Sequence, residues 1–191
     1  MTNPTKELAR AILMNAQAFE WSLQGMGMLR LHMGNNTRLH IWNDDFAAPG
    51  VSMIHDHLQW GLESTIVAGR LANLRYARHA TEVMGSRPFM MAVLKPGYGC
   101  YFKAEPAQVF LRPKTPEWYG PGDTYRQEPD EIHETSASNG TVTVMHKTPT
   151  NDESACVFWP VGSEWGSAEP RPAKPGEVEA IVKHSLERWF K

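Results

Sequence analysis

Two stretches of the chain carry apolar residues at helical spacing, one near each end. In the first, Thr5 is placed to cap a helix, which the pattern predicts over residues 5–18. In the second, Pro175 precedes the stripe, as at a first helical turn, and the pattern predicts a helix over residues 176–189. The two stripes consist of Leu8, Ile12, Leu13, Ala16 and Phe19, and of Val178, Ile181, Val182, Leu186 and Trp189.

Between these helices the pattern changes to short segments rich in β-branched and aromatic residues, separated by turn residues. Asn139-Gly140, between two alternating runs, is the strongest hairpin signal. Many short strands at close spacing predict a closed barrel or sandwich rather than βαβ units. The expected strands cover residues 27–33, 38–43, 51–57, 62–68, 70–77, 89–94, 98–103, 107–111, 131–136, 141–147 and 155–159.

Length and pattern together predict one all-β domain over residues 1–191. The barrel is expected at about residues 27–160, and the Pro-, Gly- and Ser-rich stretch 160–175 is expected to connect it to the last helix over the surface. The 191 residues are enough to bury a core without disulfides or other cross-links.

Charge and cysteine content narrow the class of protein. The net charge is -2 and no long basic run occurs, so neither nucleic acid nor an anionic membrane is an expected main partner. No apolar run approaches the roughly 18 residues of a membrane span, and the first residues lack the layout of a signal peptide. The two cysteines, Cys100 and Cys156, do not make a disulfide framework. A cytoplasmic protein with free thiols is expected.

The candidate chemistry begins at Ile54-His55-Asp56-His57. In a strand, residues two apart share one face with their Cα atoms about 6.5 Å apart. Two imidazoles on one face can converge on a metal ion at about 2.0–2.2 Å each, while Asp56 points the other way. Two histidines at this spacing also occur as ordinary surface or core residues, so the motif needs further support.

The surrounding residues resemble the cupin superfamily. Gly50 precedes the histidine pair, Gly69 closes the following strand, and a third histidine, His133, follows the turn Gly120-Pro121-Gly122-Asp123. Residues 50–69 and 120–134 carry this resemblance. It implies a double-stranded β-helix (jelly-roll) barrel with helices at both ends, in which His55, His57 and His133 bind one divalent metal ion.

The usual cupin glutamate is displaced in this chain. Leu62 stands at its position, and Glu63 follows one residue later. A slip of one residue sends a side chain to the opposite face of a strand, which places Glu63 outside unless a bulge re-aims it as a fourth ligand.

A three-histidine site without that glutamate resembles the cysteine dioxygenase group of thiol dioxygenases, over roughly residues 28–148. Arg38-Leu39-His40-Ile41-Trp42 followed by Ser52–His57 is similar to that group's approach to its HDH motif. The resemblance implies that Arg30 binds a substrate carboxylate and that His146 is a donor next to the metal ligands. A solvated surface arginine and a hydrogen-bonded core histidine are the alternative interpretations. Thr148 stands near the tyrosine of the Cys–Tyr crosslink found in some members, and the interval from His57 to His133 is long for the group.

Three neutral imidazoles leave the ion's positive charge uncompensated, so anionic ligands are favoured at its open positions. Nitrogen ligands suit Fe(II), and also Zn, Ni, Mn, Co or Cu. The leading hypothesis is a metal-dependent, non-heme iron dioxygenase that combines O₂ with a small anionic substrate, with thiols among the candidates. The alternatives are a metal-binding cupin with isomerase, lyase or hydrolase chemistry, and a non-catalytic small-molecule-binding cupin. A homodimer is what the cupin resemblance implies.

Overall fold

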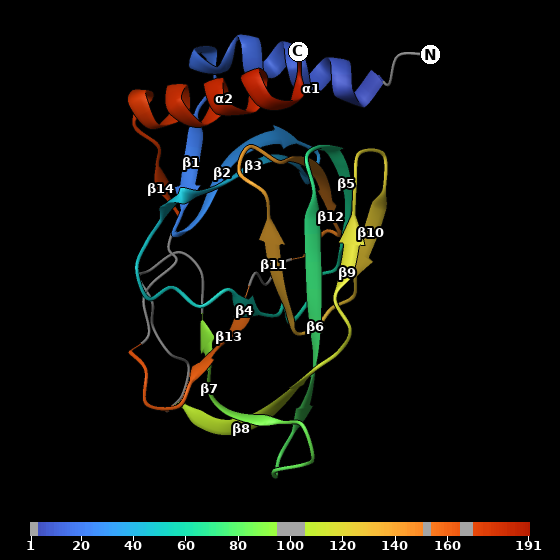
Figure 1. The fold of residues 1–191 in the computed structure, drawn as a ribbon, viewed down its shortest axis with the longest axis vertical. Helices are drawn as coiled ribbons and strands as arrows, with labels where there is room; N and C mark the ends of the chain where they lie inside the picture. The colour runs from blue at the N-terminus through green and yellow to red at the C-terminus, as the bar shows by residue number, and fades with distance from the viewer. Residues whose placement is uncertain (1–3, 95–105, 151–153, 165–169) are drawn as a thin grey trace.

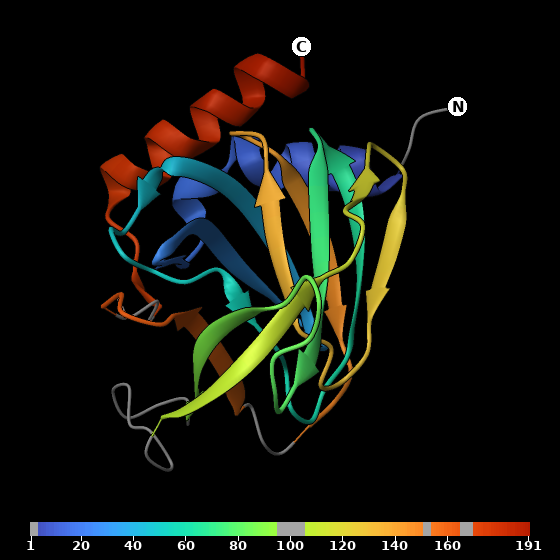
Figure 2. The ribbon, with the colours of Figure 1, turned by 60° about the horizontal axis from the view of Figure 1, so that its bottom comes forward.

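The computed structural model describes residues 4–94, 106–150, 154–164 and 170–191, and most of its regular structure is β-strand. Two helices lie side by side near the chain termini and cross the outside of one sheet (Figure 1). Figure 2 shows the same helices at one end of the molecule and strands β7, β8 and β13 at the other. All strand pairings among the described residues are antiparallel.

The strands form two sheets. The first runs in the order β10 (Thr124–Gln127), β5 (Leu62–Ala68), β12 (Val142–Lys147), β3 (Thr37–Ala47), β2 (Met26–Gly34), β1 (Trp21–Gln24) and β14 (Arg171–Pro172). The second runs in the order β11 (His133–Ala137), β4 (Ile54–His55), β13 (Ala155–Pro160), β7 (Arg87–Leu94), β8 (Ala107–Pro113), β6 (Leu71–His79) and β9 (Glu117–Tyr119).

Pairing of β11 with β6 joins two distant positions in the second sheet, so six of its strands close into an antiparallel barrel. The expected all-β class, with a closed barrel and a helix near each end, is therefore confirmed. The two sheets pack together through a cluster of apolar side chains that lies between them, formed by Met28, Trp42, Ile66, Leu71 and Tyr125.

The helices form where the apolar stripes predict them. The N-terminal helix α1 covers Pro4–Met14 and is followed by a short 3-10 helix, η1 (Ala16–Ala18), and the C-terminal helix α2 covers Pro175–Trp189. The side chain of Glu177 accepts the backbone N–H of Lys174 at 2.8 Å, which satisfies a donor at the start of α2.

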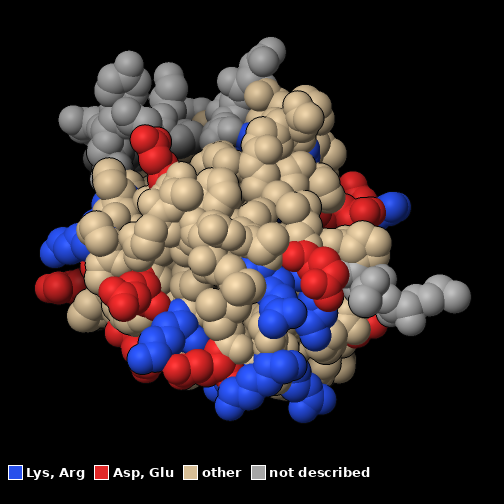
Figure 3. Space-filling model, turned by 90° about the horizontal axis from the view of Figure 1, so that it is seen from above, with Lys and Arg blue, Asp and Glu red and all other residues tan. Residues whose placement is uncertain are grey.

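A second apolar cluster fills the space between the helices and the first sheet. Ile12 and Leu13 of α1 and Ile181 of α2 pack there against Leu39 and Val144 of the strands. Figure 3 views this end of the molecule from above, where most of the charged side chains lie toward the left, right and lower edges of a largely uncharged area. The helices thus cover apolar side chains on the outer face of the first sheet.

Two local expectations differ from the structure. Asn139-Gly140 does form a turn, with the Thr141 N–H donating to Ser138 O at 3.0 Å, but the expected hairpin is wrong. The strand before the turn pairs in the second sheet and the strand after it pairs in the first, so the turn links the two sheets. The strand expected over residues 51–57 is shortened to β4. The strand expected over 98–103, with Cys100, lies outside the described residues.

Candidate metal centre

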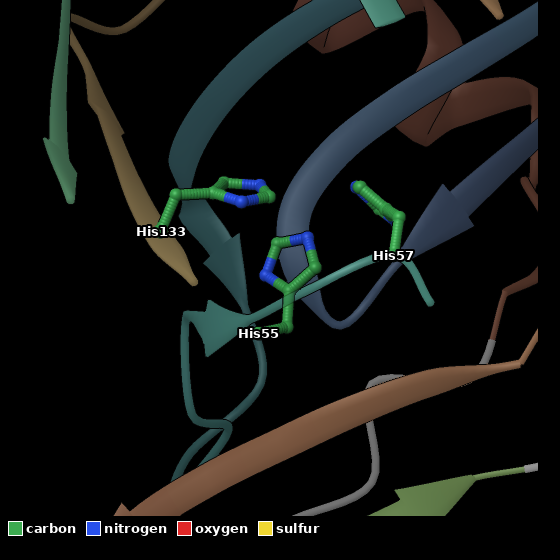
Figure 4. A group of neighbouring side chains, drawn as sticks. All are labelled: His55, His57 and His133. Atoms are coloured by element: carbon green, nitrogen blue, oxygen red, sulfur yellow. The ribbon is translucent and has the colours of Figure 1, made fainter. Parts of the chain in front are cut away.

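The three histidines singled out in the sequence lie close together in the structure (Figure 4). His55 ends β4 and His133 begins β11, and these two residues face each other across the antiparallel pair. His57 follows β4 by two residues. The ring centroids lie 4.4 Å apart for His55 and His133, 4.9 Å for His55 and His57, and 5.2 Å for His57 and His133. One nitrogen from each ring lies within 4.8 Å of the other two.

Backbone carbonyls orient two of the three rings. His55 Nδ1 lies 2.9 Å from the carbonyl oxygen of Met53, and His133 Nδ1 lies 2.8 Å from that of Glu131. A carbonyl can only accept, so each Nδ1 carries the proton and donates it, which leaves the Nε2 lone pair available. Histidines that bind metals in proteins are held by the same kind of second hydrogen bond.

Burial keeps these imidazoles neutral. It is the main cause that lowers the pKa of His55, and that lowers the pKa values of His57 and His133 well below 6.5. For His57, the pKa is lowered further by the other two histidines and by Arg38 and Lys147. Neutral imidazole is the form that binds a metal, so the group is in the ligating state at neutral pH.

Asp56, between the two neighbouring histidines, anchors β4 to β13. Its carboxylate accepts the backbone N–H of Cys156 at 2.8 Å, and its own N–H donates to the Cys156 carbonyl at 3.0 Å. Burial is the main cause that raises the pKa of the Asp56 carboxyl, and it also raises the pKa of the Cys156 thiol to about 12. The thiol is therefore protonated at neutral pH, which does not suit a nucleophile.

The donor set fits a divalent transition metal. Nitrogens bound to one ion at about 2.1 Å in a tetrahedral arrangement lie about 3.4 Å apart, so the ring nitrogens, which lie within 4.8 Å of one another, need to approach by at most about 1.4 Å to bind an ion. Glu63 is not in the group. Its carboxylate pairs with Arg126 Nε at 2.6 Å, on the strand face that the one-residue slip predicts.

His146 is exposed, and its Nδ1 lies 2.9 Å from Thr37 Oγ1. This position gives no support to the expectation that it donates beside the metal ligands. Its neighbours Met145 and Lys147 occupy the buried face of β12 instead. Side chains alternate along this part of β12 as expected, but Met145 and Lys147 are on its buried face and His146 is not.

Arg30 lies on β2, beside His40 of β3, with which it is in register. Its Nε donates to Ser22 Oγ at 3.2 Å. Arg30 is among the charges that lower the pKa of His40, after burial. Its expected role in binding a substrate carboxylate stays a prediction.

Three residues near His57 were not singled out by the sequence analysis for this site. Trp60 stacks on the His57 ring with centroids 3.7 Å apart, while Lys147 Nζ and Arg38 Cζ lie 5.3 and 5.9 Å from the Trp60 ring. One of them, Lys147, could have been found from the sequence. It is a cation at the end of the alternating set Thr143, Met145 and Lys147, all of which are buried. A lysine at the end of a buried set often has a functional or structural partner.

Acid is expected to destabilise the metal-free protein through its buried histidines. Unfolded histidine titrates near pH 6.5, whereas burial lowers the folded pKa values of His40, His57 and His133 well below that. Below about pH 6.5 the unfolded chain binds protons that the folded chain does not, so the free energy of unfolding falls as pH decreases, by up to about 1.4 kcal/mol per pH unit for each histidine. Urea unfolding between about pH 7 and pH 5 measures this slope.

The replacement His40→Gln serves as the matched variant for this prediction, since His40 lies outside the metal group. Its profile should be flatter than that of the wild type, because one of the depressed imidazoles is gone. A wild-type free energy of unfolding that does not change across this range contradicts the prediction.

Comparison with known proteins adds no family assignment. No protein-family model matches the chain, and no curated protein sequence matches it. No helix among the described residues is long and apolar enough to cross a membrane. Fold and site therefore define the class on their own: a β-barrel protein in which three buried or half-buried histidines form a group compatible with a divalent metal ion.

Proposed function

We propose that this chain is a cupin-type, metal-dependent dioxygenase that uses Fe(II) and acts on a small anionic substrate, with thiols as the leading candidates. The observation that carries the proposal is the convergence of His55, His57 and His133 with no carboxylate among them. In the proposed jelly-roll barrel, this leaves an ion with its charge unneutralised by protein ligands, which favours an anionic substrate.

The charges around the group support the same substrate class. Arg38 and Lys147 both act on His57 and both lower its pKa, which indicates a positive potential at this side of the site. Arg75 also lowers the pKa of His133, but its guanidinium is paired with Glu117 and Glu131, so it adds little to this potential. A small anion that approaches the three histidines therefore meets a field that attracts it.

The chain's own residues supply position and a dry environment in this proposal. Met53 and Glu131 hold two imidazoles through their carbonyls, and Asp56 fixes the strand between two of the ligands. An iron ion bound there would supply the chemistry of bringing substrate and O₂ together. Both oxygen atoms would enter the product, so one O₂ is consumed for each substrate molecule.

Oxygen consumption tests the proposal. The purified protein is loaded with Fe(II) without air, mixed with a panel of small thiols that carry carboxylates, and exposed to O₂ in an electrode cell. We expect uptake with at least one thiol and a product two oxygen atoms heavier than the substrate. The matched control is His146→Ala, which removes an exposed histidine outside the group and should leave uptake unchanged.

The other outcomes distinguish the alternatives. Iron-loaded protein that consumes no O₂ across the panel contradicts the dioxygenase proposal. Turnover with Zn in place of iron indicates isomerase, lyase or hydrolase chemistry, because Zn has no redox chemistry. Tight binding of a ligand without any product indicates a binding protein.

A further inference from the structure

His57 is held differently from the other two histidines of the metal centre. In the described part of the chain, its ring makes no hydrogen bond, whereas His55 and His133 each donate to a backbone carbonyl. Its backbone is held beyond the end of β4, where its carbonyl accepts the Asp130 N–H at 3.0 Å, but this bond does not fix the ring. Its orientation must therefore come from packing.

Trp60 provides that packing. The indole lies against the His57 ring at 3.7 Å between centroids and 29° between planes, which is a stacked arrangement. Trp60 is only 6% exposed, so the stack is enclosed by protein. Contact between two stacked rings favours one ring orientation beyond the effect of simple burial.

The indole is itself fixed from two sides. The next residue, Gly61, is joined to Thr148 by its N–H at 2.9 Å and by its carbonyl, which accepts the Thr148 N–H at 3.0 Å. A side chain at Gly61 would meet the Gln127 carbonyl oxygen at 2.7 Å, so only glycine lets the chain pass this closely. Lys147 and Arg38 lie within cation–π distance of the indole, from β12 and β3.

We infer that Trp60 is the positioning residue of His57. Stacking on the indole orients the His57 ring, just as hydrogen bonds to backbone carbonyls orient the rings of His55 and His133. A side chain that rotates freely loses conformational entropy when it binds a metal ion. A ring whose orientation is already fixed loses less, so its affinity for the ion is higher. The effect on metal affinity rests on the proposed metal centre, while the effect on the His57 ring does not.

The test compares Trp60→Leu, which removes the stack, with Trp60→Phe, which keeps an aromatic ring against His57. Trp42→Leu is the matched control, because Trp42 is similarly buried at 7% and its ring contacts His40 rather than the metal group. Two quantities are measured on each protein: the His57 side-chain resonances of the metal-free protein, and the affinity for Zn by competition with a chromophoric chelator.

In Trp60→Leu the His57 ring protons should move downfield as the indole ring current is lost, and Zn affinity should fall about 10–100-fold, as it does when an outer partner of a metal ligand is removed. Trp60→Phe should restore most of that affinity, and Trp42→Leu should change neither quantity. Unchanged His57 resonances and Zn affinity in Trp60→Leu overturn the inference.

Two further outcomes keep the inference separate from the proposed function and from folding. If the wild type binds no Zn, the metal centre fails, but the His57 resonances of the metal-free variants still decide whether Trp60 positions the ring. If Trp60→Leu does not fold, magnetisation transfer between the indole and the His57 ring protons in the wild type decides the point, and its absence overturns the inference.

Discussion

Replacing His133 with alanine is expected to remove metal binding almost completely. His133 is 2% exposed, and its ring lies 4.4 Å from that of His55, with Nδ1 occupied by the Glu131 carbonyl. Without it, two imidazoles remain, and one of them is not held by a hydrogen bond. The affinity for Zn or Fe(II) should fall by more than about 100-fold, beyond the range for partners that only support a ligand.

Elemental analysis of the purified protein, together with a Zn titration, measures this effect. His146→Ala is the control, because it removes the same side chain from an exposed site whose ring contacts Thr37 instead. That variant should retain the wild-type metal content. A His133→Ala protein that still copurifies with as much metal as the wild type shows that these three histidines are not the site.

Replacing Gly69 with alanine is expected to destabilise the fold strongly. Gly69 joins β5 to β6 with φ +89°, in the region that L-residues rarely adopt, and an added Cβ would come within 2.7 Å of Thr141 Cα and still closer to the Thr141 hydroxyl. Thr141 is fully buried, and its hydroxyl bonds the Arg70 backbone, so it cannot move aside. Left-handed strain of about 1–2 kcal/mol and overpacking of about 1–3 kcal/mol should together lower the free energy of unfolding by about 2–5 kcal/mol.

Gly122→Ala separates the effect of backbone strain from that of overpacking against Thr141. Gly122 has a similar φ of +94°, but nothing lies within 4 Å of the position of its Cβ. Only the backbone strain applies there, and the loss should be about 1 kcal/mol. Equal losses in the two variants, measured by urea unfolding, would show that the contact with Thr141 is unimportant.

Local sequence pattern was sufficient for features that depend on neighbouring residues. The apolar stripes predicted both helices, because a helix needs one continuous apolar face to bind to the rest of the protein. The one-residue slip in β5 correctly placed Glu63 outside the histidine group, where it pairs with Arg126. His55 and His57 came together through their spacing alone.

Other features depend on contacts between segments that are far apart in the sequence, which the local pattern does not reveal. The first four residues of β12 are buried on both faces of the strand, and Val142 and Val144 pack in the cluster beneath the helices, so alternation could not tell whether His146 or Lys147 points toward the site. The turn at Asn139-Gly140 was visible, but the strands on either side of it join different sheets. A local turn signal carries no information about which distant strands complete the hydrogen bonding.

The sequence by itself determined the β-rich class, the terminal helices and the types of side chain available to bind a metal. The tertiary structure decided that His133 faces His55 across a strand pair, that Trp60 stacks on His57, and that Arg38 and Lys147 act on His57. The physical reason is that helix and strand preferences act between neighbours in the chain, whereas these contacts arise from pairing and packing of segments that are far apart in sequence.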